Sequence, residues 1–141
     1  MAKNILLCGF MSCGKTTVGK KLAALLNYKF MDTDDMIIES TGKSVKEIFN
    51  EGGEVLFRDI EHETAKKIQY LNDCVISTGG GLMTYQRNVD VIKNSIIVYI
   101  NTDFEVCYNR LKGTGRPIVS SKTKQEMWQM YFERIEKYKK V

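Results

Sequence analysis

The segment Gly9–Thr17, with the sequence GFMSCGKTT, decides the fold. Its spacing Gly-x-x-x-x-Gly-Lys-Thr is the pattern of a phosphate-binding P-loop, and it lies between the apolar run NILLC at residues 4–8 and a stretch with helical periodicity. Glycines let backbone N–H groups approach phosphate oxygens, and the positive end of the following helix adds attraction. The sequence therefore predicts a strand, a phosphate-binding loop and a helix in this order.

The side chains of this loop have separate expected tasks. Lys15 would reach the β- and γ-phosphates of a nucleotide, and Thr16 would place its hydroxyl on Mg²⁺. Cys13 lies beside this lysine at the start of a helix, so a functional thiol is one interpretation, but a small residue in backbone-led phosphate binding is favoured. The expected nucleotide contacts of the loop are Ser12, Cys13, Gly14, Lys15, Thr16 and Thr17.

Composition limits the class of protein. With 43% hydrophobic and 27% charged residues in a chain of 141, residues 1–141 are expected to form a single domain around one core. A net charge of +4 from scattered basic residues argues against nucleic-acid binding. The apolar runs are short, and the four cysteines form no Cys-x-x-Cys pair, so we expect no signal peptide, membrane segment or disulfide. A monomer in the cytoplasm is the resulting expectation.

Short apolar runs alternate with helical periods along the chain, which predicts a three-layer α/β/α fold around a central parallel sheet. Capping boxes at Ser44–Glu47 and Thr102–Glu105 would each open a helix. The polar segment at about 112–123 contains the only proline and is expected to be a mobile lid. The predicted strands are 4–8, 28–30, 74–77 and 95–100, and the predicted helices are 15–26, a short one from 44, 54–71, one ending near 111, and 124–140.

Two predicted strands are followed by residues suited to a ligand site, because open α/β sheets bind ligands at the carboxyl ends of their strands. Asp32 and Asp34 lie two apart on extended chain; one would hold the Mg²⁺ shell and the other would accept a proton from an acceptor hydroxyl. The structural alternative is that they cap the next helix, a task that Asp34 or Asp35 could perform. At residues 78–81, TGGG, contact of bare backbone with a ligand is favoured over a loose turn.

Several arginines are candidates for anion binding. Glu61 lies three residues after Arg58, so its carboxylate could hold the guanidinium for a planar anionic partner, although helical periodicity alone makes the pair structural. Arg116 precedes the proline of the lid and could swing over a γ-phosphate. Arg110 and Arg134 are the remaining candidates. The lone histidine, His62, is expected at the surface of a long polar helix and is assigned no role.

These motifs together resemble those of the shikimate kinase family, small P-loop kinases of the nucleoside monophosphate kinase superfamily. The resemblance covers nearly the whole chain: GFMSCGKTT is similar to the nucleotide loop, FMDTD to the acidic motif, GGEVLFRDIE to the glycine-glutamate and arginine motif, STGGG to the triple-glycine loop and GRP to the lid arginine. It implies transfer of the γ-phosphate of ATP, with Mg²⁺, to the 3-hydroxyl of shikimate in aromatic amino acid biosynthesis.

The resemblance also implies roles for individual residues. Lys15 and Arg116 would stabilise the transferring phosphoryl group, and Asp34 would hold and deprotonate the reacting hydroxyl. Mg²⁺ would be coordinated by Thr16, with Asp32 nearby through water, and Arg110 would lie against adenine. Shikimate would be bound by Asp34, Arg58, Gly79, Gly80, Gly81 and Arg134, with substrate-binding helices at about 32–62 and Glu61 orienting Arg58.

Two features depart from the family pattern. Residues 134–138, RIEKY, keep the family's arginine and tyrosine without the proline often found between them. Family members also continue with a final strand, a loop over the adenine and a closing helix, so we expect the final strand and helix to be missing here.

Other functions share parts of the pattern. A gluconate kinase or a nucleoside monophosphate kinase would share the loop and the lid, and a non-catalytic module would share nucleotide binding. Asp34, Arg58 and the glycines at 79–81 favour a small carboxylated polyol over a nucleotide base as the acceptor.

Overall fold

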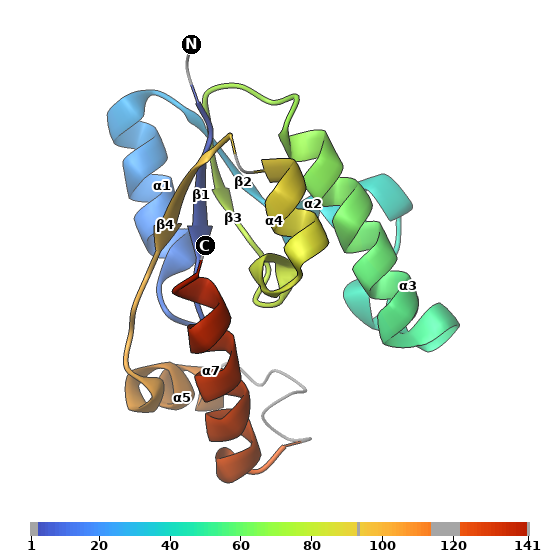
Figure 1. Ribbon diagram of the computed structural model, residues 1–141, viewed down its shortest axis with the longest axis vertical. Helices are drawn as coiled ribbons and strands as arrows, with labels where there is room; N and C mark the ends of the chain where they lie inside the picture. The colour runs from blue at the N-terminus through green and yellow to red at the C-terminus, as the bar shows by residue number, and fades with distance from the viewer. Residues whose placement is uncertain (1–2, 93, 114–121, 141) are drawn as a thin grey trace.

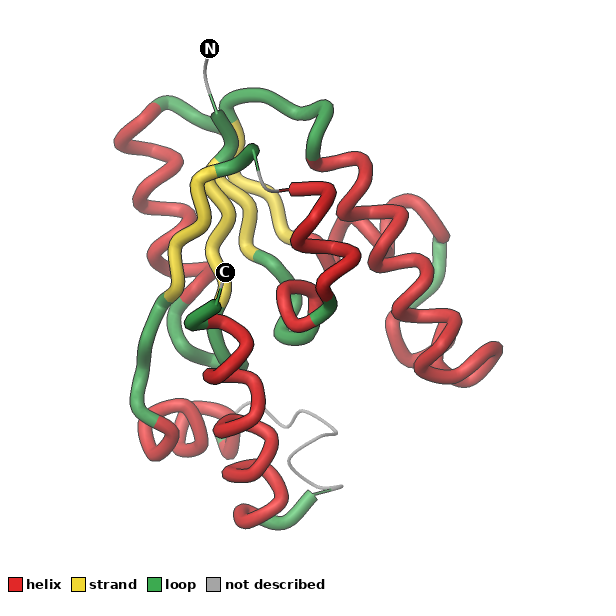
Figure 2. Tube along the Cα trace, viewed as in Figure 1, coloured by secondary structure: helices red, strands yellow, loops and turns green. Residues whose placement is uncertain are grey.

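Four parallel strands form the central sheet of the computed structural model, which describes residues 3–92, 94–113 and 122–140 (Figures 1 and 2). Their order is β2-β3-β1-β4, and in the middle Leu6 is in register with Ile76 on one side and Ile97 on the other. The strands are β1 (Ile5–Cys8), β2 (Lys29–Asp32), β3 (Cys74–Ser77) and β4 (Ile96–Tyr99). The predicted parallel sheet is confirmed.

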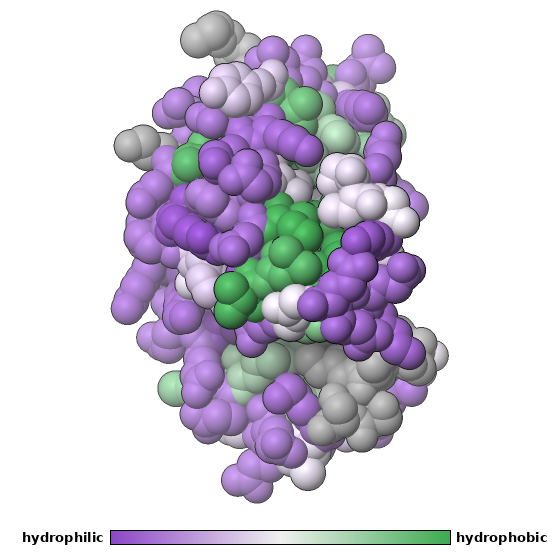
Figure 3. Space-filling view, turned by 90° about the vertical axis from the view of Figure 1, so that its right-hand side faces the viewer, coloured by the Kyte–Doolittle hydropathy of each residue, from purple (hydrophilic) through white to green (hydrophobic). Residues whose placement is uncertain are grey.

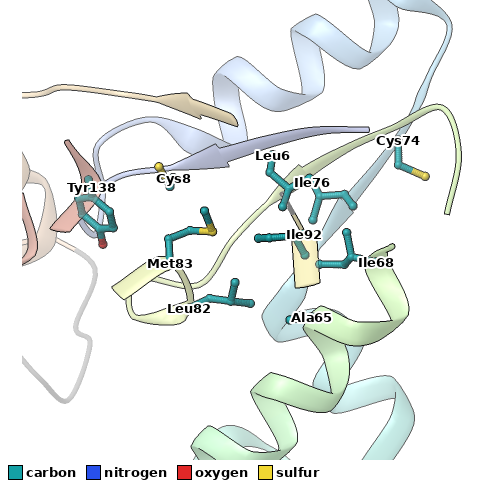
Figure 4. Close-up of a cluster of buried hydrophobic side chains, with 10 residues drawn as sticks. All are labelled: Leu6, Cys8, Ala65, Ile68, Cys74, Ile76, Leu82, Met83, Ile92 and Tyr138. Atoms are coloured by element: carbon teal, nitrogen blue, oxygen red, sulfur yellow. The ribbon is translucent and has the colours of Figure 1, made fainter. Parts of the chain in front are cut away.

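Helices cover both faces of this sheet, as the sequence alternation predicts (Figure 1). On one face Leu7 and Val75 pack with Ala23 of α1 (Lys15–Leu26). On the other face the neighbouring strand residues pack against α3 (Val45–Ile68), the short helix η1 (Leu82–Thr84) and α4 (Gln86–Ile92), as Figure 4 shows for Leu6, Ile76 and Ile68. The side-chain period of two along each strand produces the three layers.

The connection between β2 and β3 carries two helices that project from the sheet. Asp32 ends β2 and is the N-cap of α2 (Thr33–Thr41), and Ser44 caps α3 in the predicted capping box with Glu47. The predicted short helix and the helix from 54 are one element with a non-helical residue at Gly53 (φ 67°, ψ −161°). A buried cluster of Ile37, Ile48 and Phe57 joins α2 to α3. Figure 3 views the surface from the right-hand side of Figure 1 and shows a group of apolar residues surrounded by polar ones.

Two helices and an aromatic cluster form the end of the molecule beyond the carboxyl ends of the strands. They are α5 (Phe104–Lys112) and α7 (Lys124–Tyr138). The cluster contains Phe10, Phe104 and Tyr131, with Tyr131 edge-on to Phe10 at 5.1 Å between ring centroids. This packing attaches both helices to the chain segment that follows β1.

Three differences from the sequence predictions are informative. The capping box at Thr102–Glu105 is wrong: Asp103 is the N-cap of α5 without a side-chain cap bond, because the Thr102 hydroxyl donates instead to the carbonyl oxygen of Cys13. Strand β2 runs to Asp32, and η1 and α4 were not predicted.

In the part of the chain that the structure describes, no strand follows α7, and β4 lies at an edge of the sheet. No helix in the same part is long and apolar enough to cross a membrane.

Candidate active site

A cavity of about 1550 Å³ opens at the carboxyl ends of the strands. It is lined by residues 11–18, the start of α2, the middle of α3, residues 77–81 and Arg134 of α7. This is the edge at which open α/β sheets bind ligands, because the strands end there and the following loops and helix N-termini converge. Most residues proposed from the sequence as nucleotide-binding or acceptor-binding therefore face one cavity.

The loop after β1 has the backbone that a phosphate-binding loop requires. Gly9 and Gly14 have φ of 156° and 109°, and Ser12 has a left-handed φ of 60°, which is uncommon for a residue with a side chain. The ammonium group of Lys15 folds back over the loop and donates to the carbonyl oxygen of Gly9 at 2.6 Å and to that of Phe10 at 3.3 Å. The lysine thus lies inside the curve of its own loop.

The start of α1 is built to attract an anion. Gly14 is its N-cap, no side chain in the described part of the chain caps it, and its first turn has no acidic residue. The first backbone N–H groups and the positive end of the helix are therefore directed at the cavity. Burial lowers the pKa of Lys15, since burial costs the charged ammonium its hydration, and an anionic ligand would oppose this effect. Thr16 and Thr17 lie exposed in the same turn and line the cavity.

Contacts from the β4–α5 region hold the outer side of this loop. Arg110 of α5 donates from Nη1 to the carbonyl oxygen of Ser12 at 3.0 Å, and Thr102 donates to that of Cys13 at 2.8 Å. These two bonds connect the loop to the β4–α5 region. Cys13 is 4% exposed, so the hypothesis of a functional thiol has no accessible sulfur to support it.

The two aspartates at the end of β2 have different positions. Asp32 is half-buried, and its Oδ1 accepts the backbone N–H groups of Asp34 (2.8 Å) and Asp35 (3.3 Å). The structural alternative thus applies to Asp32, and Asp34 lies in the first turn of α2 rather than on extended chain. Burial raises the pKa of Asp32, although the two backbone N–H groups oppose this shift. Asp34 lines the cavity beside the loop that follows β3.

Arg58 and Glu61 form a fixed pair on α3. Nη1 of Arg58 lies 3.0 Å from Oε1 of Glu61, whose side chain is only 1% exposed. Burial raises the pKa of Glu61, and the guanidinium works against that shift. The guanidinium also lies between the rings of Phe57 and Tyr85, with its Cζ 5.2 and 5.1 Å from their centroids. An arginine held on several sides in this way loses little further entropy when it binds a planar anion.

Arg134 reaches the same cavity from α7. Its guanidinium lies over the ring of Phe10, with Cζ 6.0 Å from the centroid, and burial lowers its pKa. Among the described residues, no carboxylate lies within ion-pair distance of it. A half-buried guanidinium without a carboxylate partner among the described residues is suited to an anion from outside the chain.

The three glycines after β3 each leave room for one charged group of the cavity. A Cβ atom on Gly79 would lie 2.8 Å from Oδ1 of Asp34, and one on Gly80 would lie 2.9 Å from Nη1 of Arg134. A Cβ atom on Gly81 would lie 2.5 Å from Nη1 of Arg58. Each of the three glycines thus lies against one charged side chain, and the three side chains come from three different helices.

Sequence reasoning missed several residues that shape the site. The buried hydroxyl of Thr33 accepts the N–H of Gly79 at 2.7 Å, so this N–H is occupied within the protein. Tyr85 packs on Arg58, and the hydroxyl of Tyr138 donates to the carbonyl oxygen of Gly80. These contacts join residues far apart in the chain, and only the position of Tyr138 one helical turn after Arg134 gave a signal of its location.

One sequence hypothesis concerns residues outside the described ranges, and another is corrected. Arg116 lies outside the described residues, as does most of the expected lid at 112–123; α5 ends at Lys112 and Thr123 is the N-cap of α7. His62 is not simply a surface residue: its Nδ1 lies 2.8 Å from Oδ1 of Asn88, which is buried and donates to the carbonyl oxygen of Leu82. The described residues contain no cluster of three or more His, Cys, Asp or Glu side chains for a metal centre.

Known proteins are similar to this chain in sequence and fold. The shikimate kinase family model matches residues 11–141. The chain is 37% identical to a shikimate kinase of Persephonella marina over 140 residues, which is 99% of this chain and 83% of that protein. It superposes on a shikimate kinase from Acinetobacter baumannii, solved in complex with shikimate, with a TM-score of 0.91 and 34% identity over 99% of this chain and 80% of that one.

A more distant likeness concerns the fold alone. A gluconokinase from Sinorhizobium meliloti 1021 superposes with a TM-score of 0.58 and 17% identity over 94% of this chain and 74% of that one. The alternative of a gluconate kinase is not favoured, because the matching family model and the relatives at 34% and 37% identity are shikimate kinases. The chain belongs to the shikimate kinase family.

Proposed function

We propose that the cavity catalyses transfer of the γ-phosphate of ATP to the 3-hydroxyl of shikimate, which gives shikimate 3-phosphate and ADP. The observation that carries this proposal is the joining, in one cavity, of an uncapped P-loop helix with Asp34, Arg58 and Arg134 around three glycines. Membership of the shikimate kinase family supports the reaction, and the complex of the Acinetobacter baumannii relative with shikimate supports the acceptor.

The nucleotide side fits ATP with Mg²⁺. Phosphate oxygens would be bound by the N–H groups at the start of α1 and by Lys15. Mg²⁺ takes one or two protein oxygens and completes its shell with phosphate and water. Thr16 and Oδ2 of Asp32 would hold it, since both backbone bonds to Asp32 use Oδ1. When bound, the ion supplies charge neutralisation on the phosphates.

The acceptor side fits a small polyol that carries a carboxylate. Arg58 is fixed by Glu61 and by two rings, so it presents a preorganised fork to the carboxylate, and Arg134 faces it from α7. Asp34 lies in the first turn of α2 on the side of Gly79 and would accept the proton of the reacting hydroxyl. The hydroxyl oxygen then forms its bond to the γ-phosphorus while the bond to the bridging oxygen breaks, and ADP leaves with that electron pair.

Positioning accounts for most of the catalysis in this proposal. The two substrates lie in one cavity and react in line, which turns an encounter of two molecules into an event within one complex. Lys15 would stabilise charge on the transferring group. A role of Arg116 over the γ-phosphate, a lid at 112–123, contact of Arg110 with adenine, a monomeric state and a cytoplasmic location stay predictions.

The test is ADP release with Mg·ATP in the presence of shikimate, gluconate, AMP or no acceptor, with Lys15→Met as the matched inactive control. We expect turnover with shikimate alone and its loss in the variant. Turnover with gluconate or AMP, or none with any acceptor while the chain is folded by circular dichroism, would contradict the proposal.

A further inference from the structure

One face of α7 holds three residues whose polar ends reach the carboxyl edge of the sheet. Tyr131, Arg134 and Tyr138 are spaced by three and four residues, so they lie on one face of the helix. Arg134 is the middle residue and lines the cavity. The two tyrosines are 6% and 2% exposed, and each donates its hydroxyl to a backbone carbonyl outside the helix. They therefore attach α7 to the rest of the site.

The two hydroxyl groups reach different loops. Tyr131 donates to the carbonyl oxygen of Thr102 at 2.9 Å, in the segment after β4. Tyr138 donates to the carbonyl oxygen of Gly80, the middle glycine of the loop after β3. Burial raises the pKa of Tyr138, so its hydroxyl keeps the proton that it donates. Only the second bond touches the acceptor side of the cavity.

Gly80 is held from two sides by the same helix. The Tyr138 hydroxyl bonds to its carbonyl oxygen, and Nη1 of Arg134 lies 2.9 Å from the position that a Cβ atom on Gly80 would take. The ring of Tyr138 is fixed in turn: it belongs to the main core cluster in Figure 4 and lies 5.5 Å from the ring of Tyr99. A buried ring with its hydroxyl on a backbone carbonyl has one orientation, so it sets where this peptide lies.

We propose that Tyr138 is a positioning residue for the acceptor, acting through Gly80 to fix the glycine loop at 79–81 against Arg134. This inference rests on the proposed function and names a residue that does not itself line the cavity. Removal of the hydroxyl frees the Gly80 carbonyl, lets the loop shift against the guanidinium and weakens acceptor binding. The nucleotide side keeps its own contacts, because the P-loop bonds of Thr102 and Arg110 do not involve Tyr138.

The experiment compares Tyr138→Phe with Tyr131→Phe, which removes a buried hydroxyl-to-carbonyl bond from the same helix but from a different loop. Both variants keep the ring, so similar small losses of thermal stability are expected. Tyr138→Phe should raise the KM for shikimate about fivefold, the effect of one buried hydrogen bond, with the KM for ATP unchanged. Tyr131→Phe should leave the KM for shikimate unchanged.

Hydrogen exchange of the full chain gives a readout that needs no activity. The amides of Gly79, Leu82 and Thr84 are bonded within or next to the glycine loop, and their exchange should quicken in Tyr138→Phe but not in Tyr131→Phe. Unchanged exchange in this loop, or an unchanged KM for shikimate, would overturn the proposal. If the wild-type chain fails to phosphorylate shikimate while the loop exchange still quickens, the proposed function fails and the fixing of Gly80 by Tyr138 is supported.

Discussion

The nucleotide side and the acceptor side of the cavity are constructed in different ways. The nucleotide side comes mostly from one continuous segment, and the bond from Lys15 to Gly9 spans 6 residues of sequence. The acceptor side combines α2, α3, the loop after β3 and α7, and its defining bonds span 46 residues between Thr33 and Gly79 and 58 between Gly80 and Tyr138.

The nucleotide side therefore depends on fewer elements of the fold than the acceptor side. The bonds of Lys15 inside the phosphate-binding loop are local, and the outer carbonyl contacts of Thr102 and Arg110 join the loop to a distant part of the described chain. The acceptor-side residues reach their positions only when all four elements are packed together. Small changes in packing should therefore affect acceptor binding before nucleotide binding. The two sides should therefore respond separately to substitution, and the following variants test this separation.

The largest effect is expected for Lys15→Met on the nucleotide side. Removal of the ammonium group, which lies inside the P-loop, should lower kcat by about 10²–10³, the usual cost of losing one donor to developing charge. Shikimate binding in the absence of nucleotide, measured by calorimetry, should stay within about twofold, because the hydrogen bonds of Lys15 go to its own loop and not to the acceptor side. A parallel loss of shikimate affinity would show that the two sides are one coupled unit.

The next effect is expected for Arg58→Ala on the acceptor side. Loss of a charge-assisted fork to the substrate carboxylate should raise the KM for shikimate about 10- to 100-fold and leave the KM for ATP unchanged. Arg58→Lys is the matched control, because it keeps a cation near Glu61 but not the planar fork. It should recover less than half of the lost binding free energy; full recovery would argue against bidentate recognition.

A smaller effect is expected for Gly81→Ala. The added Cβ atom would meet the guanidinium of Arg58 at 2.5 Å, so the arginine must move and the KM for shikimate should rise about tenfold, as for a tightly packed site. Gly42→Ala is the control: Gly42 has φ of +69° and open space around it, so it should cost about 1 kcal/mol of stability without a change in KM. Equal KM values in both variants would remove the special role of the glycine loop.

The smallest effect is a gain in stability for Asp32→Asn. Burial raises the pKa of Asp32, so its carboxylate destabilises the fold as pH rises through that pKa, whereas asparagine keeps the N-cap without the charge. The free energy of unfolding at neutral pH without Mg²⁺ should increase, but by less than one hydrogen bond contributes, which is about 1 kcal/mol. The gain should vanish at a pH below the ordinary aspartate pKa; a gain independent of pH would point to another cause.

Much of the fold followed from the sequence pattern, and the misses have physical reasons. Alternating apolar runs located the four parallel strands, and the P-loop and the Ser44 capping box were identified correctly. The Thr102 capping box failed because a tertiary acceptor, the Cys13 carbonyl, took the hydroxyl that the local pattern assigned to the helix. Helix α4 was missed because its seven residues, QRNVDVI, carry too short an apolar period to stand out.

The sequence by itself determined the phosphate loop, the parallel sheet and the residues that could serve an acceptor, because spacing along a strand or helix fixes which side chains share a face. The tertiary structure alone decided which residues meet. It placed Tyr85 on Arg58, gave each glycine of 79–81 a charged neighbour and put Tyr138 on Gly80. Such contacts depend on close packing between elements distant in the chain. The spacing of apolar residues along one helix or strand does not predict them.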